Sequence, residues 1–196
     1  MPNQLMPNQS LNLVSSSEHS GPNKQDFSSE VAFGGLDTPI GRLNLAATSK
    51  GLLRVGFTAM QSAEDFVANV VGLTNLSNQG EATWLNQPAS QLGEYFEGSR
   101  KCFELKLDWR LSHGFYAQVL KALLLVDYGT TISYGELARM AGSANAARAV
   151  GTAMSTNSLA LVVPCHRVIR SDGTVGEYAG RPEIKAWLVA HELAHR

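Results

Sequence analysis

The chain has 196 residues, of which 44% are hydrophobic and 17% are charged, and its formal net charge is −1 at pH 7. This length suffices for one or two domains with a buried core, and the charge excludes DNA binding driven by an overall positive chain. The sequence has no apolar run long enough to span a membrane, and its first residues lack the features of a signal peptide. We therefore expect a cytoplasmic protein (bacterial cytosol, or nucleus in a eukaryote) with no membrane partner.

Composition divides the chain into three parts. Residues 1–30 are rich in Ser, Asn, Gln and Pro, bury too little apolar surface to fold, and are predicted to be a disordered tail. Residues 31–112 form a predicted N-terminal domain, and residues 113–196 a C-terminal domain. Residues 1–112 carry eight basic and eleven acidic side chains, whereas residues 113–196 carry eight and six. The C-terminal domain is therefore the better candidate for contact with nucleic acid.

Hydrophobic periodicity predicts a small sheet with helices in the N-terminal domain. Residues 43–47 and 53–57 alternate as half-buried strands do, and turns between them indicate an antiparallel meander. Residues 63–71 and 84–96 have helical spacing, and residues 103–109 return to strand alternation. No catalytic cluster is found in this domain.

The C-terminal domain begins with helical patterns. Residues 115–127 have an amphipathic spacing, and Ser133 with Glu136 forms a capping box that opens a second helix. Ser143 is predicted to cap a third helix that runs to about Met154. Two short helices joined around a glycine indicate a helix-turn-helix. The last of these helices is rich in small residues and poor in base-reading side chains, which suits sequence-independent contact in a shallow groove.

A reactive cysteine follows this motif. An extended apolar run at residues 161–169 contains Pro164, Cys165, His166 and Arg167. Pro164 stiffens the backbone that enters Cys165, and a base or cation nearby favours the nucleophilic thiolate, for which His166 and Arg167 are candidates. Adjacent side chains do not point the same way, so a bridging water is easier to picture than direct proton transfer.

The sequence gives no sign of a disulfide framework, a zinc site or a cofactor motif. The two cysteines, Cys102 and Cys165, make neither a disulfide framework nor a Cys-x-x-Cys zinc pair, and Cys102 is expected to be inert. No glycine-rich cofactor fingerprint is present. We therefore expect no metal and no cofactor.

Five clusters share the order and spacing of one family. The first is Pro-Cys-His-Arg-Val at residues 164–168. The others are Ile132-Ser133-Tyr134, the run from Ala146 to Gly151 with Asn157, the loop of Gly176, Tyr178, Ala179 and Gly180, and Lys185, Trp187, Leu188 and Glu192. The sequence resembles the O6-alkylguanine-DNA alkyltransferases, closely over residues 113–194 and more loosely over residues 31–109.

The resemblance implies a fold and an activity. The fold would be α+β, with a small antiparallel, ribonuclease-H-like sheet domain and a helical domain carrying a winged helix-turn-helix-like motif. The activity would be DNA repair by irreversible transfer of a methyl or larger alkyl group from O6 of guanine, with O4 of thymine as an open alternative, to the protein's own Cys165. The partner would be double-stranded DNA containing O6-alkylguanine, whose target nucleotide is flipped out through the minor groove. The protein would act once, as a monomer.

The resemblance also assigns residue roles. Cys165 would accept the alkyl group, His166 and Glu192 would form a proton relay with it and lower its pKa, and Tyr134 would rotate the target phosphate and donate to the base. Without the resemblance, Glu192 reads as a solvent-facing helix charge. Arg148 would fill the gap left by the flipped nucleotide. The implied DNA-binding residues are Arg148, Ala147, Ala149, Gly151 and Tyr134; the implied pocket residues are Met154, Val168, Tyr178 and Ala179; and Asn157 would brace the active-site segment. Ala179 lacks the hydroxyl that some members carry, and Arg181 departs from the usual glycine pattern.

Two other functional classes stay open. A helix-turn-helix regulator, or an alkylation-damage sensor without turnover, would not need Cys165. A Cys-His hydrolase would need an oxyanion hole and would turn over repeatedly.

Overall fold

The computed structural model describes residues 29–176, 178 and 181–196. Residues 29 and 30 do not belong to a disordered tail: the N–H of Ser77 donates to the carbonyl of Ser29, and the N–H of Val31 donates to that of Ser77, both at 2.9 Å. The predicted tail is therefore two residues too long, and its remainder lies outside the described residues. Within the described ranges, no helix is long and apolar enough to cross a membrane.

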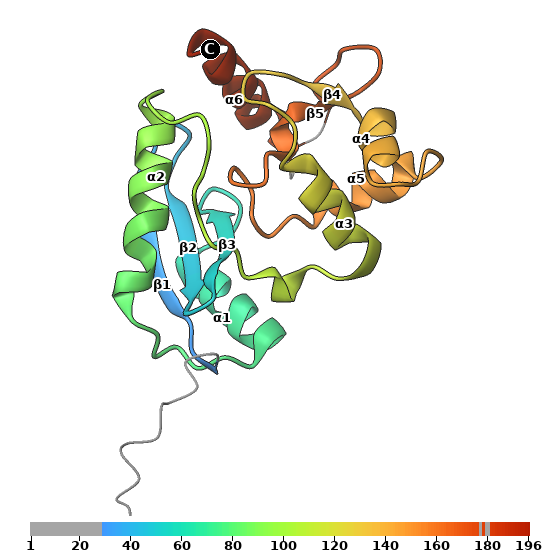
Figure 1. The fold of residues 1–196 in the computed structure, drawn as a ribbon. Helices are drawn as coiled ribbons and strands as arrows, with labels where there is room; N and C mark the ends of the chain where they lie inside the picture. The colour runs from blue at the N-terminus through green and yellow to red at the C-terminus, as the bar shows by residue number, and fades with distance from the viewer. Residues whose placement is uncertain (1–28, 177, 179–180) are drawn as a thin grey trace, which may run out of the picture.

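Three strands form an antiparallel sheet with the order β1-β2-β3. They are β1 (Ala32–Leu36), β2 (Leu43–Thr48) and β3 (Gly51–Phe57) (Figure 1). Gly51 has a φ of 131°, a conformation that favours glycine and allows the tight turn from β2 into β3. The predicted meander is confirmed.

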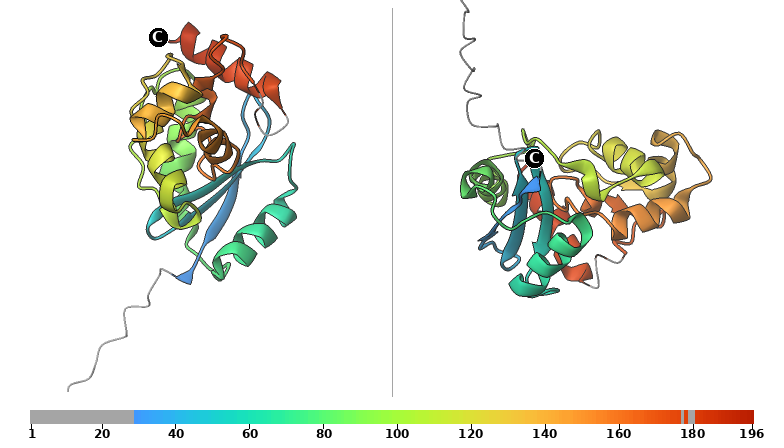
Figure 2. Two further views of the ribbon diagram at one scale, coloured as in Figure 1. Left: turned by 90° about the vertical axis from the view of Figure 1, so that its right-hand side faces the viewer. Right: turned by 90° about the horizontal axis from the view of Figure 1, so that it is seen from below.

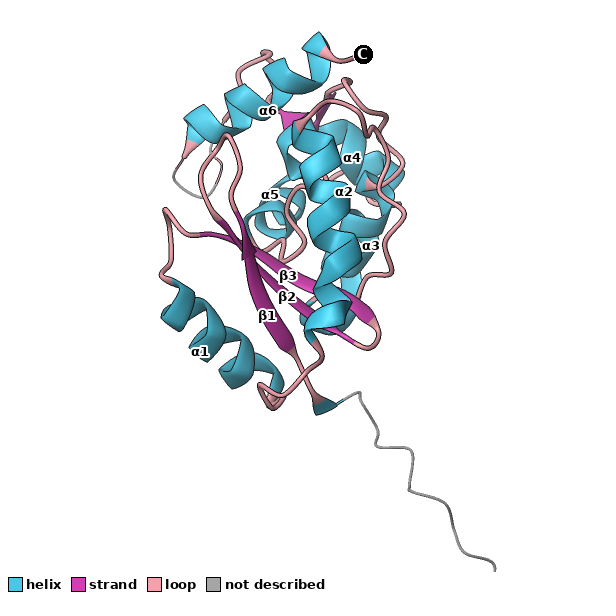
Figure 3. Ribbon diagram, turned by 90° about the vertical axis from the view of Figure 1, so that its left-hand side faces the viewer, coloured by secondary structure: helices cyan, strands magenta, loops and turns pink. Residues whose placement is uncertain are grey.

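The central strand of this sheet is buried on both faces. All six residues of β2 are buried. Helix α1 (Ala63–Thr74) covers the face that carries Ala46, whereas helix α2 (Asn86–Phe96) and the C-terminal part pack on the face that carries Leu45 (Figure 3). The prediction of a half-buried strand is wrong here, because α1 covers the face that the alternation pattern assigned to solvent.

The predicted strand at residues 103–109 does not form. This segment makes only an isolated bridge, in which Leu52 donates to the carbonyl of Lys106 at 2.9 Å and accepts from the N–H of Asp108 at 2.8 Å. Farther along the same edge, the N–H of Val55 donates to the carbonyl of Ser158 at 2.8 Å. The free edge of β3 is thus shared between two segments, which leaves too few consecutive pairs for a fourth strand. A short 3-10 turn follows at Trp109–Leu111.

The C-terminal part is mainly helical. Its elements are α3 (Gly114–Leu123), α4 (Tyr134–Met140), α5 (Ala147–Ser155) and α6 (Pro182–Ala194), with a short parallel pair of β4 (Ile132–Ser133) and β5 (Val168–Ile169). Helices α3, α4 and α5 gather on one side of the molecule, and the sheet with α1 and α2 lies on the other (Figure 2).

The predicted helices of the C-terminal part form, with one boundary confirmed and two shifted. Ser133 and Glu136 make the reciprocal capping box that opens α4. The helix predicted over residues 115–127 ends at Leu123 and continues as tighter turns. Ser143 does not cap α5: its carbonyl accepts from the N–H of Ala146 at 3.0 Å, and this turn delays the start of the helix to Ala147.

One apolar core joins the N-terminal and C-terminal parts. The same cluster of buried side chains contains Leu45 and Val55 of the sheet, Tyr95 of α2, and Val163 and Leu188 of the C-terminal part. The sheet therefore packs directly against the segment that carries Cys165.

Candidate active site

Cys165 is presented by a tight turn. The predicted extended run is instead folded back on itself, with Leu161 in a left-handed conformation (φ 73°) and the N–H of Val163 donating to the carbonyl of Leu159 at 2.8 Å. At Pro164 (φ −82°, ψ 65°) the chain makes an inverse γ-turn, and the N–H of Cys165 donates to the carbonyl of Val163 at 2.9 Å. Cys165 then opens a one-turn 3-10 helix that leads into β5.

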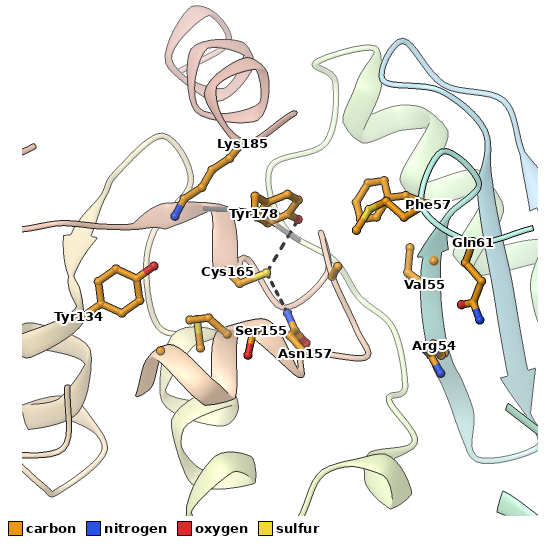
Figure 4. Close-up of a pocket in the computed structure, with 15 residues that line it drawn as sticks. Arg54, Val55, Phe57, Gln61, Tyr134, Ser155, Asn157, Cys165, Tyr178 and Lys185 are labelled. Carbon is orange, nitrogen blue, oxygen red and sulfur yellow. Dashed lines mark hydrogen bonds between the residues drawn. The ribbon is translucent and has the colours of Figure 1, made fainter. Parts of the chain in front are cut away.

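The thiol of Cys165 has few contacts. The side-chain amide of Asn157 donates to Sγ at 3.1 Å and to the carbonyl of Val163 at 2.9 Å, so Asn157 braces the cysteine segment. The thiol donates to the hydroxyl of Tyr178 over 3.8 Å (Figure 4). Burial raises the pKa of the Cys165 thiol and outweighs the opposing effects of Asn157, Tyr178 and Lys185. The expected low thiol pKa is thus wrong for the free protein.

His166 is buried with one ring nitrogen unpaired. Its Nε2 lies 2.7 Å from Oε1 of Glu192. Burial lowers the pKa of His166, so the ring is neutral at pH 7. Because Glu192 is ionised, Nε2 carries the proton, and Nδ1 has its lone pair free. Nδ1 has no hydrogen-bond partner among the described residues. Nδ1 is therefore the ring nitrogen that can accept a proton.

Glu192 is 1% exposed and does not face solvent. Its Oε1 accepts from Tyr95 at 3.0 Å, from His166, and from Arg167 at 3.1 Å; its Oε2 accepts from the N–H of Gly129 and from Arg167, both at 2.9 Å. Burial disfavours the charge, but the hydrogen bonds and charges of His166 and Arg167 lower the pKa of Glu192 to about 2. The carboxylate is held ionised at the back of His166.

A cavity of about 310 Å³ opens on the thiol. Tyr134, Met154 and Tyr178 line it together with Cys165, as does Lys185, whose Nζ lies 5.9 Å from the centre of the Tyr134 ring (Figure 4). Burial raises the pKa of Tyr134, so its hydroxyl stays protonated. The volume is at the lower end of the range for sites that hold small organic ligands.

Comparisons with known proteins point to one family for both parts of the chain. The model of the 6-O-methylguanine DNA methyltransferase DNA-binding domain matches residues 114–194, and that of the same family's ribonuclease-like domain matches residues 31–109. The chain belongs to this family. The human methylated-DNA–protein-cysteine methyltransferase is 38% identical over 169 residues, covering 82% of this chain and 79% of the human one. The constitutive Bacillus subtilis protein of that name is 38% identical over 154 residues, covering 78% and 90%.

Solved structures of the family share the fold. The Mycobacterium tuberculosis O6-methylguanine methyltransferase superposes with a TM-score of 0.72 at 33% identity, covering 85% of this chain and 94% of that one. A structure of the M. tuberculosis protein in complex with DNA superposes with a TM-score of 0.70 at 34% identity over the same shares. The α+β fold expected from the resemblance is confirmed.

Helix α5 presents small residues beside the cavity. Gly151 lines the cavity, and a Cβ placed there would meet open space. Arg148 lies one helical turn earlier, is exposed, and its side chain makes no hydrogen bond or ion pair with a described residue. Ala147 is exposed and Ala149 half-buried, and neither lines the cavity.

The predicted pocket residues are only partly brought together. Tyr178 and Met154 line the cavity, whereas the fully buried side chain of Val168 does not, and the carbonyl of Val168 accepts a hydrogen bond from Lys185. Ala179 lies outside the described residues.

Sequence reasoning missed three functional contacts. Arg167, proposed as a cation for the thiol, binds Glu192 instead, with a further bond to the carbonyl of Val126. Tyr95 reaches Glu192 from α2. Lys185 is 1% exposed and still lines the cavity, and its place in the cluster with Trp187 and Leu188 that matches the family was the available signal.

Proposed function

We propose that this protein repairs double-stranded DNA by accepting, once and irreversibly, the alkyl group of O6-alkylguanine on Cys165. The observation that carries the proposal is a thiol that opens on a cavity and is followed in the same turn by a neutral His166, which an ionised Glu192 contacts. A nucleophile, a base and a group that orients the base are the elements of a nucleophilic site.

The reaction begins with removal of the thiol proton. A water between Sγ and Nδ1 of His166 passes that proton to the ring, and Glu192 stabilises the imidazolium that forms. Lys185 and the amide of Asn157 stabilise the thiolate. Burial raises the pKa of the Cys165 thiol, so the thiol is protonated in the free protein and its proton has to be removed before attack.

The transfer itself is an in-line displacement at carbon. The bond from Sγ to the alkyl carbon forms as the bond from that carbon to O6 breaks, and the electron pair of the broken bond moves into the purine. Tyr134, which is protonated and lines the cavity, donates to the purine and so stabilises the charge. The purine gains one proton for the one that the thiol loses. The product thioether has no easy return, so the protein is consumed.

The target base must leave the duplex to reach Cys165. Helix α5 enters the minor groove with Ala147, Ala149 and Gly151, whose small side chains permit close approach to DNA. Arg148 occupies the space left by the extruded nucleotide, and Tyr134 turns its phosphate. The exposure of Arg148 one turn from Gly151 at the cavity supports this placement.

A pair of cysteine variants tests the proposal. Cys165→Ala is expected to abolish transfer from a duplex with a labelled O6-methyl group while keeping DNA affinity near that of the parent, because the thiol contributes little to phosphate contact. Cys102→Ala, at the other, exposed cysteine, is expected to transfer as the parent does. Transfer that persists in Cys165→Ala would refute the assignment.

A further inference from the structure

A second cavity lies beside helix α1, on the face of the sheet that carries Ala46. Its volume is about 250 Å³, and it is lined by residues of β1, β2 and α1 and by Arg42, which directly precedes β2 (Figure 3). Within the described part of the chain, it shares no lining residue with the cavity on Cys165. We call it the Asn44 cavity, because Asn44 and Arg42 are its polar lining residues and the others are apolar side chains or glycines.

Asn44 carries a buried amide that has no partner. It lies two residues before Ala46 on β2, so its side chain is on the α1 face of the sheet. Asn44 is 5% exposed, and its Nδ2 is buried without a hydrogen-bond partner among the described residues. Its Oδ1 accepts no hydrogen bond from them either. Buried amides without partners are rare, because their lost contacts with water are not replaced. The amide is therefore free to bind a group that enters the cavity.

The strands on both sides of Asn44 have a glycine opposite it. These are Gly35 of β1 and Gly56 of β3. A Cβ on Gly35 would lie 2.7 Å from the guanidinium of Arg42, and a Cβ on Gly56 would lie 2.7 Å from the ring of Phe66. The two larger side chains thus lie over the two glycines. The amide of Asn44 is placed between a cation and an aromatic ring.

The apolar wall of the Asn44 cavity is preformed. The rings of Phe33 and Phe66 meet edge to face with centroids 6.2 Å apart, and the guanidinium of Arg54 lies 5.5 Å from the centre of the Phe66 ring. Ala63 and Val67 of α1 complete this wall. Apolar walls with few polar groups are typical of small-molecule sites, and those for drug-sized ligands begin at roughly 300 Å³. The Asn44 cavity suits a single ring with a short substituent.

The polar groups define the chemistry of the occupant. A side-chain amide presents a donor and an acceptor side by side, so its full complement is a group with an adjacent acceptor and donor. Arg42 pairs with Asp37 at 2.8 Å, and its charge is thereby balanced without a ligand. The site therefore favours a neutral amide or lactam over a carboxylate.

We propose that the Asn44 cavity binds a small flat molecule, an aromatic ring that carries an amide or lactam edge. The edge pairs with the amide of Asn44, and the ring packs against Phe33 and Phe66. This binding activity is separate from the reaction at Cys165 and does not rest on the proposed function.

Two probes of one shape test the hydrogen bonds. Benzamide carries the amide edge, and acetophenone has a methyl group in place of its NH₂ group, so acetophenone keeps the ring and the carbonyl but has no donor. Each is titrated into the full-length ¹⁵N-labelled protein, and the N–H signals of Gly35 and Asn44 are followed by NMR. Benzamide should bind about fivefold more tightly than acetophenone, which corresponds to one additional net hydrogen bond.

Two variants locate the binding. Ala63→Trp fills the cavity from an exposed position, and Ala68→Trp is its matched control, because exposed Ala68 on the same helix does not line the cavity. Asn44→Leu removes the amide without breaking a hydrogen bond to a described residue. The affinity for benzamide should fall at least tenfold in Ala63→Trp and stay at the parent value in Ala68→Trp. Asn44→Leu should bind benzamide no more tightly than acetophenone.

Three results would overturn the proposal. The first is the absence of a saturable benzamide shift in the parent protein up to about 20 mM, which would leave water as the partner of Asn44. The second is equal affinity of the parent protein for benzamide and acetophenone. The third is benzamide binding that Ala63→Trp weakens no more than Ala68→Trp does. Because Ala63 is exposed, this last comparison holds even if Asn44→Leu does not fold.

Discussion

The two ends of the Cys165–His166–Glu192 arrangement are built in opposite ways. Glu192 is enclosed and accepts five hydrogen bonds from groups on α2, the α3–β4 connection and the cysteine turn. Cys165 receives one bond from Asn157, makes a weak contact with Tyr178, and opens on a cavity.

The difference follows from what each end does. A carboxylate that orients a base must stay in one place and remain charged, and buried charges do so only when they are fully hydrogen-bonded. A sulfur that attacks carbon must keep a free approach. His166 lies between these two ends, with Nε2 fixed by Glu192 and Nδ1 unpaired among the described residues.

Removing Arg167, the main cation bound to Glu192, should have the largest effect on stability. Arg167→Ala leaves the Glu192 charge buried with its principal partner gone, and is expected to lower the free energy of unfolding by about 3–5 kcal/mol. Urea denaturation measures this. Arg148→Ala is the matched control, since exposed Arg148 should change the value by less than ~0.5 kcal/mol. Similar losses for the two variants would show that Glu192 does not depend on Arg167.

Acid should destabilise the folded protein, because protonation of Glu192 and His166 is linked to unfolding. The folded protein holds the pKa values of Glu192 and His166 below their ordinary values, so the unfolded chain binds more protons and stability falls as pH falls. The loss should begin below about pH 6.5 through His166 and continue from about pH 4.5 to about 2 through Glu192, which contributes about 3 kcal/mol. The free energy of unfolding, measured across this pH range, should decline less steeply with falling pH in Glu192→Gln than in the parent protein. Parallel curves for the two proteins would contradict the account.

At the open end, Arg148→Ala tests base extrusion. Losing about 2 kcal/mol of support for the extruded state should slow reaction with duplex roughly thirtyfold and leave reaction with the free alkylated base unchanged. Single-turnover rates at saturating duplex measure this. If Arg148→Ala matches the parent at saturation and differs only in salt-dependent affinity, Arg148 is a phosphate contact and not a space-filling residue.

Replacing Tyr95, which binds Glu192, should have a smaller effect than the changes above, and replacing Tyr128 nearby should have none. Tyr95→Phe removes one hydrogen bond to Glu192 and is expected to slow transfer about tenfold and to cost ~1.5 kcal/mol of stability. Rescue of the rate at higher pH should accompany it, because a looser Glu192 weakens His166 as a base. Tyr128→Phe is the control: its hydroxyl is buried without a partner among the described residues, so its removal should cost nothing. Equal effects of the two changes would remove Tyr95 from the relay.

The sequence is informative where structure is local. The capping box of Ser133 and Glu136 depends on neighbours a few residues apart and is found as predicted. In β3, Val55 and Phe57 share a face as predicted, but a register shift between β2 and β3 places Leu53 in the cluster on the opposite face. Burial of both faces of β2 depends on where α1 packs, which no local pattern contains.

The site shows the same division. The run from Pro164 to Arg167 indicates a reactive cysteine, but the partner of Arg167 lies 25 residues away and the tyrosine that binds Glu192 lies 97 residues from it. Contacts at these separations are fixed only by the packing of α2 and α6 against the shared core, so motif spacing reveals the residues without their partners.

The central claim is that Cys165 itself receives the alkyl group and is consumed. Mass spectrometry of the intact protein and its peptides, after incubation with excess duplex containing O6-methylguanine, tests this most directly. The account predicts that the peptide with Cys165 gains the mass of one methylene group, that the peptide with Cys102 is unchanged, and that repaired guanine stops at one equivalent per protein. Repaired guanine that continues beyond one equivalent, or an unmodified Cys165 peptide after repair, would contradict it.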